Sequence, residues 1–445
     1  MSPSFLQALR LAALIFAVMA VSPDARAGEI RTLTIDQALE IAAVRNRGVA
    51  RALEYRNLTE GRYVEERAAA LPHFTLSGSL IRQDDDAVED PILERRDARV
   101  ELNQALFTWG EIQSTVRAAR IGLLTADEQL RFSRQAALRD AALAFYDVLL
   151  ARELNRVAAQ NLEQKSRRLA EAKRRNTVGV ATDYDMLVAE VAEANARPEV
   201  LRTANLINSR RDRLRLVLGI DESVDAIGEL SSPLTDPPGY AEALTIAEDR
   251  RPDLRDLDYR IGIAEELVTI ANAGDKPRLD LAGSAGWEEL ETEDDRRDDQ
   301  NWDIGLKLTW PLFDGLRTRG QVQQARSERD ALRIDRQQLL DTISVETREA
   351  IDAVHVAIEL VRALDGTVVQ AERLLALAEK GFEYGVKIRL EVDDAELNLR
   401  QAQTSLAIAR RDYLSAMVEL AWAMGVLGES KLPDLPATAA TSIPR

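Results

Sequence analysis

In residues 302–310 every second position is apolar, and the positions between them carry Asp, Gly, Lys and Thr. The apolar positions are Trp302, Ile304, Leu306, Leu308 and Trp310. This period of two is typical of a β-strand with one apolar face. The same alternation occurs in three other segments, and together they predict two hairpins of strands, over about 73–107 and 278–312.

A very long helical stretch follows each hairpin. Residues 111–176 and 316–381 contain almost no glycine or proline and are rich in the residues that favour helix. At about 1.5 Å per residue, each stretch would reach about 100 Å. A turn at Gly179 or Gly385 then leads into a return helix, which we expect to end near residue 218 or 424. Helices of this length need lateral packing, so the sequence predicts coiled-coil hairpins.

The two halves of the chain are a tandem repeat. Matched positions are Ala38-Leu39 with Ala243-Leu244, Leu106-Phe107 with Leu312-Phe313, and "VGVATDYDMLVAE" with "YGVKIRLEVDDAE". The offset is 205 residues in the early matches and 206 in the later ones. The predicted units are a first repeat at 28–220, a connecting segment at 221–239, a second repeat at 240–428 and a flexible tail at 429–445.

The first 27 residues have the pattern of an export signal. Arg10 precedes an apolar run over 11–21 that is too short to cross a bilayer, and Ala25-Arg26-Ala27 is a small-residue cleavage site. We therefore expect cleavage after Ala27. The alternative is a membrane anchor that stays attached.

Composition excludes several functions. The net charge of −17 argues against a nucleic-acid partner, because phosphate binding needs clustered Lys and Arg. The chain has no cysteine and two histidines, which excludes disulfides and thiolate metal sites and makes a histidine-based metal site or catalytic triad unexpected. No phosphate loop or nucleophile–base pair is present, so we predict a protein that is not an enzyme and has no cofactor.

The four predicted strands have one polar face and long acidic turns, which is the pattern of an outer-membrane β-barrel. Four strands cannot close a barrel, because the open edges would leave backbone groups unpaired in hydrocarbon. Copies of the chain must therefore associate. Two copies would supply eight strands and three would supply twelve, and strand pairing alone permits both.

Several segments carry a resemblance to a known family. They are "LTIDQALEIA", "LPHFTLSGSL", "WPLFDGLRTRG", "YGVKIRLEVDDAELNLRQAQ" and "ELAWAMG", in a doubled order that covers most of residues 33–427. In this pattern the chain resembles the TolC-type outer-membrane efflux and secretion channels. Some members of the family carry an acylated N-terminal cysteine. This chain has no cysteine, so the resemblance implies that its barrel alone would hold it in the membrane.

The resemblance implies a mainly helical fold with a small membrane β-barrel. A homotrimer would form a twelve-stranded barrel in the outer membrane of a Gram-negative-type cell and a helical tunnel across the periplasm. The channel would serve a tripartite efflux or type I secretion system, with a periplasmic adaptor and an inner-membrane pump of the RND, ABC or MFS type. The alternative is that the chain is itself a periplasmic adaptor, although adaptors have one helical hairpin and many short strands.

The resemblance also assigns roles to residues near the two far turns. Glu391 and Asp394 match an acidic ring at the tunnel entrance, with Asp185 as the first-repeat counterpart of Glu391. Lys387 opposite Asp185 matches a latch that holds the tunnel closed. Asp393 is an added acid that the family usually lacks. The alternative is that these are solvated charges beside a turn.

Two further surfaces follow from the same resemblance. The turn residues Gly179, Val180, Gly385 and Val386 would dock the adaptor, although glycine is also what a simple reversal needs. The apolar face of residues 302–310 would lie against outer-membrane lipid, with a tryptophan at each interface. The alternative for that face, a strand of a soluble sandwich, would need more strands than four.

Overall fold

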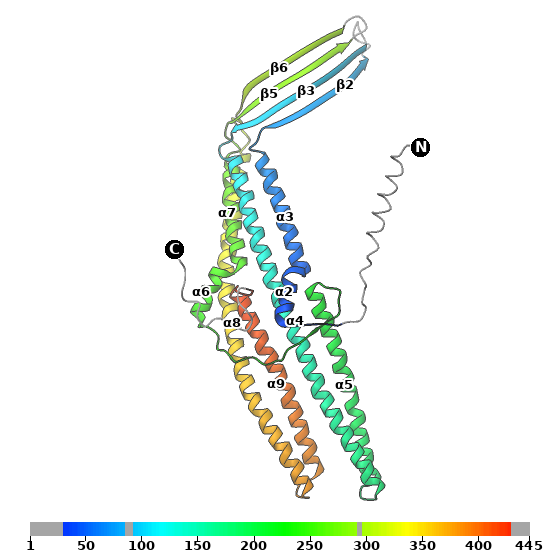
Figure 1. Cartoon of the computed structure of the whole chain (residues 1–445). Helices are drawn as coiled ribbons and strands as arrows, with labels where there is room; N and C mark the ends of the chain where they lie inside the picture. The colour runs from blue at the N-terminus through cyan, green and yellow to red at the C-terminus, as the bar shows by residue number, and fades with distance from the viewer. Residues whose placement is uncertain (1–29, 85–91, 292–295, 429–445) are drawn as a thin grey trace, which may run out of the picture.

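The computed structural model describes residues 30–84, 92–291 and 296–428. The predicted signal segment with Ala27 and the predicted tail at 429–445 lie outside these residues. The strands of the main sheet lie at one end of an elongated molecule, and the tips of two long helical hairpins lie at the other (Figure 1). The elements are β1 (Arg31–Leu33), α2 (Ile35–Arg45), α3 (Arg47–Ala68), β2 (His73–Asp84), β3 (Ile92–Phe107), α4 (Glu111–Thr177), α5 (Asp183–Leu218), β4 (Val224–Ala226), α6 (Tyr240–Arg250), α7 (Pro252–Asn272), β5 (Arg278–Glu291), β6 (Arg296–Thr309), α8 (Arg317–Glu383) and α9 (Arg389–Ala423).

The main sheet is antiparallel, with the strand order β2-β3-β5-β6. Its pairing brings the apolar positions of all four strands onto one face. One row comprises Leu76, Val100, Ala285 and Trp302, and the next comprises Phe74, Leu102, Gly283 and Ile304. The opposite face is polar, and Ser284 there donates a hydrogen bond to Asp303.

The predicted lipid-facing stripe lies on β6, which is one edge of this sheet. Trp302, Ile304, Leu306 and Leu308 are each between 63% and 77% exposed. Trp310 is also exposed, but it lies just after the last residue of β6. The strands β2 and β6 each have one edge without a neighbour among the described residues. The sheet therefore presents an apolar face and two unpaired edges.

Each repeat begins with two helices that meet at a sharp break. Asn46 caps α3, because its side-chain oxygen accepts a hydrogen bond from the Gly48 amide at 2.7 Å. In the second repeat Arg251 occupies the cap position, and Pro252 is the first residue of α7, where a missing amide hydrogen costs nothing. The breaks bend both helix pairs at the middle of the molecule (Figure 1).

A glycine at the end of each return helix fits against each break. A Cβ atom on Gly219 would lie 2.3 Å from the Arg45 carbonyl oxygen, and one on Gly425 would lie 2.8 Å from the Arg251 amide nitrogen. Both glycines have φ near +70°. Only glycine permits this backbone approach in both repeats.

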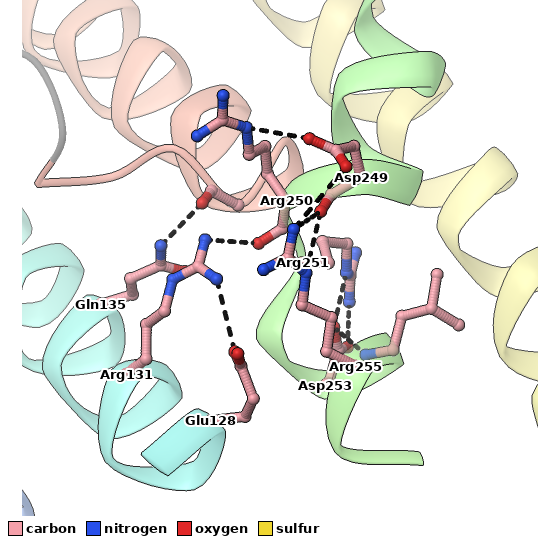
Figure 2. Close-up of polar contacts among 10 residues, drawn as sticks. Glu128, Arg131, Gln135, Asp249, Arg250, Arg251, Asp253 and Arg255 are labelled. Carbon is pink, nitrogen blue, oxygen red and sulfur yellow. Dashed lines mark hydrogen bonds and ion pairs between the residues drawn. The ribbon is translucent and has the colours of Figure 1, made fainter. Parts of the chain in front are cut away.

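Polar side chains from α4 form hydrogen bonds to the backbone at the helix break of the second repeat (Figure 2). Arg131 donates a hydrogen bond of 2.7 Å to the Arg250 carbonyl, and the buried Gln135 side chain donates one of 2.7 Å to the Gly425 carbonyl. From α7, Arg255 donates to the Asp249 carbonyl at 2.7 Å. Carbonyl groups freed at the helix ends are thereby satisfied. These bonds fix the upper part of α4 to the second repeat.

The main hydrophobic core lies at the same level as the breaks. Its largest fully buried side chains include Phe145, Leu214, Ile358 and Leu420. The segment expected as a connection at 221–239 contributes to it, because β4 pairs in parallel with β1. The segment is also tied to α9, where the Tyr413 hydroxyl donates to the Pro233 carbonyl at 3.0 Å.

No helix within the described part of the chain is both long enough and apolar enough to cross a bilayer.

Candidate functional site

Two exposed turns form the lower tips of the molecule, one between α4 and α5 and one between α8 and α9 (Figure 1). Gly179 and Gly385 have φ values of +75° and +71°, so each reversal requires glycine or pays a steric cost. Val180 and Val386 follow the glycines and are 75% and 78% exposed. The tips therefore present apolar side chains that the other described residues leave exposed.

In the first tip, Asp185 stabilises the start of its own helix. The Asp185 carboxylate accepts hydrogen bonds from the Thr182 amide at 3.0 Å and the Thr182 hydroxyl at 2.7 Å. The Thr182 side chain in turn accepts a bond from the Asp185 amide, which completes a capping box. These bonds favour the ionised carboxylate and lower the pKa of Asp185.

In the second tip, Glu391 has the corresponding place at the start of α9. It accepts a hydrogen bond from the Ile388 amide at 3.0 Å and pairs with Lys387. The bond from Lys387 is the largest cause that lowers the pKa of Glu391, and the Ile388 amide adds to it. Gly381 provides room for the aliphatic part of Lys387, because a Cβ atom there would lie 2.4 Å from the lysine Cγ.

The predicted Lys387–Asp185 latch is not formed within this chain. Lys387, in the turn before α9, pairs with Glu391 at the start of α9, and Asp185 bonds to Thr182, the cap residue of α5. The two tips also lie apart in Figure 1. A latch between these residues therefore stays a prediction that requires another arrangement of the tips.

The remaining predicted acids lie on different sides of α9. Asp394 is exposed and makes no hydrogen bond or ion pair with other described residues, and its place in an acidic ring stays a prediction. Asp393 instead points toward α4, where it bonds to Arg168 at 2.7 Å. Asp393 is therefore a contact between the two helical hairpins.

A buried cluster of charges joins α4 to α9 just above the tips. Glu396 is 6% exposed and accepts hydrogen bonds from Gln164 at 2.6 Å, Lys165 at 3.0 Å and Arg168 at 2.6 Å. Burial lowers the pKa of Lys165, and the nearby positive charge of Arg168 lowers it further. Two acids and two bases thus neutralise one another between the repeats, a site that inspection of the sequence did not identify.

The sequence does contain a signal for this cluster. Lys165 and Arg168 are three residues apart on α4, and Asp393 and Glu396 are three residues apart on α9. Each pair therefore lies on one face of its helix. The pairing of the two faces could be recognised only once α4 and α9 were known to be neighbours. Among the described residues no cluster of three or more His, Asp or Glu side chains is arranged to bind a metal ion.

The sequence is similar to those of known outer-membrane efflux and secretion proteins. The sequence profile of the outer membrane efflux protein family matches residues 38–220 and 243–426. The outer membrane protein TolC of Vibrio cholerae is 24% identical over 382 residues, which are 83% of this chain and 86% of that protein. The alkaline protease secretion protein AprF of Pseudomonas aeruginosa is 25% identical over 381 residues, which are 82% of this chain and 79% of that protein.

Solved structures share the fold. The Campylobacter jejuni CmeC outer membrane channel superposes with a TM-score of 0.78 at 17% sequence identity and covers 89% of this chain and 87% of that one. The Neisseria gonorrhoeae MtrE outer membrane channel in its open state superposes with a TM-score of 0.75 at 19% identity, covering 88% and 89% of the two chains.

Proposed function

We propose, since this chain belongs to the outer membrane efflux protein family and is an outer-membrane channel for efflux or secretion, that three copies form one conduit from an inner-membrane pump to the exterior. Trimers and tripartite pumps are general to the family. The more specific proposals concern how this chain closes its barrel, docks its adaptor and controls the entrance of its tunnel.

One observation carries the conduit proposal. The sheet has an apolar face and unpaired outer edges on β2 and β6, and it lies at the end opposite the helical tips. A sheet in hydrocarbon must have every backbone group paired, which four strands cannot achieve. Three copies would give twelve strands, a permitted even number. The helices would then extend from that barrel into the periplasm.

The exposed tips support docking of a partner. Gly179-Val180 and Gly385-Val386 present apolar side chains on turns that are held by capped helices. In the proposed assembly these turns bind the helical hairpin of a periplasmic adaptor. The pump behind that adaptor is of the RND, ABC or MFS type.

The acids near the second tip support an electrostatic entrance. Glu391 and Asp394 lie one helical turn apart on α9, and Asp394 is unpaired among the described residues. Three copies around an axis would bring six carboxylates together, with Asp185 nearby on the first tip. Like charges at close range attract cations and oppose closure. In the closed state Lys387 would exchange Glu391 for Asp185 and latch the tips.

The trimer is tested by mass measurement of the purified protein in detergent. We expect a particle of three chains, each lighter than the 49.4 kDa of the full sequence by the mass of the cleaved signal segment, together with discrete conductance steps in planar bilayers. A folded single chain that needs no detergent would contradict the proposal, because the sheet edges would then have no partner.

The entrance is tested by single-channel recordings of two variants. Glu391→Gln combined with Asp394→Asn is expected to abolish block by added divalent cations and to reduce cation selectivity, because the ring then carries no charge. Lys387→Met is expected to lengthen openings, because the latch loses its cation. Glu359→Gln, an exposed acid far up α8, serves as the control. Unchanged block would exclude the ring, and unchanged openings would exclude the latch.

A further inference from the structure

We propose that neighbouring copies meet along an inter-copy seam, defined as α8 of one copy against α3 and α5 of the next, whose residue pairs follow from the internal repeat. Within each copy, α4 packs against α7 and α9, and this contact is called the internal seam. The inter-copy seam has the same arrangement of helices as the internal seam, but different residue types occupy the corresponding positions. The inference rests on the proposed trimer and adds the residues that hold it together.

The internal seam buries one face of α4, and the corresponding face of α8 is exposed. The two helices have the same length and are offset by 206 residues, yet α4 has 17 buried residues and α8 has 11. Leu150 on α4 is 9% exposed, whereas its counterpart Val356 on α8 is 59% exposed. One face of α8 therefore lacks the neighbour that α4 has.

The offset predicts a leucine pair in the lower part of the inter-copy seam. In the internal seam Arg168 on α4 bonds to Asp393 on α9 at 2.7 Å. A shift of 206 residues moves Arg168 to Leu374 on α8 and Asp393 to Leu187 on α5. Leu374 is 49% exposed and Leu187 is 56% exposed. An ion pair inside the copy thus corresponds to an apolar pair between copies.

The offset predicts an ion pair in the upper part. In the internal seam Gln129 on α4 donates to Asp256 on α7 at 3.2 Å. The counterparts are Asp335 on α8 and Arg51 on α3, which carry opposite charges. Both are exposed and neither has a partner within the described chain.

Burial supports this alignment of α3 with α7. The offset of 205 residues superposes Val49 on Leu254 and Thr59 on Ala264, and all four side chains are buried. A slip of one residue would break both matches, because helix positions rotate by about 100° per residue. The matched buried positions lie before and after Arg51 in the helix, so they fix Arg51 as the counterpart of Asp256.

The sheet supports a second copy as the occupant. Val100 on β3 pairs with Ala285 on β5 inside the copy. The same shifts give Leu306 on β6 beside Leu80 on β2 of the next copy, two exposed residues of the same apolar face. The repeat offsets thus give complementary residue pairs in three places: the lower helices, the upper helices and the sheet. A foreign partner would have no reason to match the repeat offset.

The absence of cysteine allows a direct test. In the purified trimer, Leu187→Cys together with Leu374→Cys is expected to form covalent dimers and trimers with a short bis-maleimide cross-linker, seen on denaturing gels; a linker is used because an Arg–Asp contact can join backbones too far apart for a disulfide. The matched control is Leu187→Cys with Val356→Cys, because Val356 lies about 27 Å away along α8 and cannot reach the same partner. The control is expected to give single chains only.

A charge-reversal cycle tests the upper pair independently. Arg51→Asp and Asp335→Arg are each expected to speed dissociation of the trimer in detergent about fivefold, because like charges then face one another. The double variant is expected to restore the original rate. A trimer without the cross-link and without this rescue would overturn the inter-copy seam and leave the channel proposal standing. A chain that is not trimeric would overturn both.

Discussion

Replacement of Leu306 by arginine is expected to keep the protein out of the outer membrane. Leu306 lies near the middle of the apolar stripe on β6 and is 66% exposed. A charged side chain on the lipid face of a barrel costs about 2–4 kcal/mol at the bilayer centre. A trimer carries this cost three times in one barrel, so the sum is comparable to the whole stability of a domain.

The measurement is the amount of folded, heat-modifiable trimer in the outer-membrane fraction. Lys307→Arg is the matched control, because Lys307 is the next residue of β6 and its side chain lies on the opposite, polar face. We expect normal insertion of the control. Equal insertion of both variants would show that the stripe does not contact lipid.

Arg168→Leu is expected to loosen the contact between the two helical hairpins. Arg168 bonds to Asp393 and Glu396, and Glu396 is buried. Removing one partner of a buried ion pair costs about 3–5 kcal/mol, because the remaining charge loses its compensation. Lys165 stays within 3.0 Å of Glu396, so we expect a loss of about 3 kcal/mol. Faster hydrogen exchange and proteolysis below the core would report it.

Two variants separate this effect from a general loss of charge. Arg167→Leu removes the adjacent arginine, which is mostly exposed and forms a surface ion pair with Glu163, so a loss of about 0–1 kcal/mol is expected. Arg168→Leu combined with Asp393→Leu reproduces the leucine pair of the inter-copy seam and is expected to recover much of the loss. Equal exchange rates in all variants would mean that the cluster contributes nothing to the contact.

Much of the fold could be predicted because its signals are periodic and repeated. The alternation at 302–310 predicts an apolar face, and the structure confirms that the four strands combine their apolar positions on one side. Gly179 and Gly385 mark the far turns, since positive φ values leave few other choices. The fold class, the family and the channel function were therefore within reach of the sequence.

The site was less predictable because its contacts are set by tertiary structure. Arg168 and Glu396 are 228 residues apart in the chain, and no local pattern indicates which helices become neighbours. Lys387 could pair with Asp185 on the other tip or with Glu391 four residues on, and in the single chain the nearer carboxylate is chosen. The resemblance suggested the distant pair, whereas helix geometry favours the local one.

The duplicated plan of the chain has a consequence for how it can vary. A polypeptide with one repeat could build the same ring only from six identical copies, and any substitution would then alter all six contacts between neighbouring repeats. In the proposed trimer the lower contacts would alternate between a charged kind, around Arg168, and an apolar kind, around Leu374. Each kind can therefore change in strength without the other, so one set of contacts can remain closed while the other set opens.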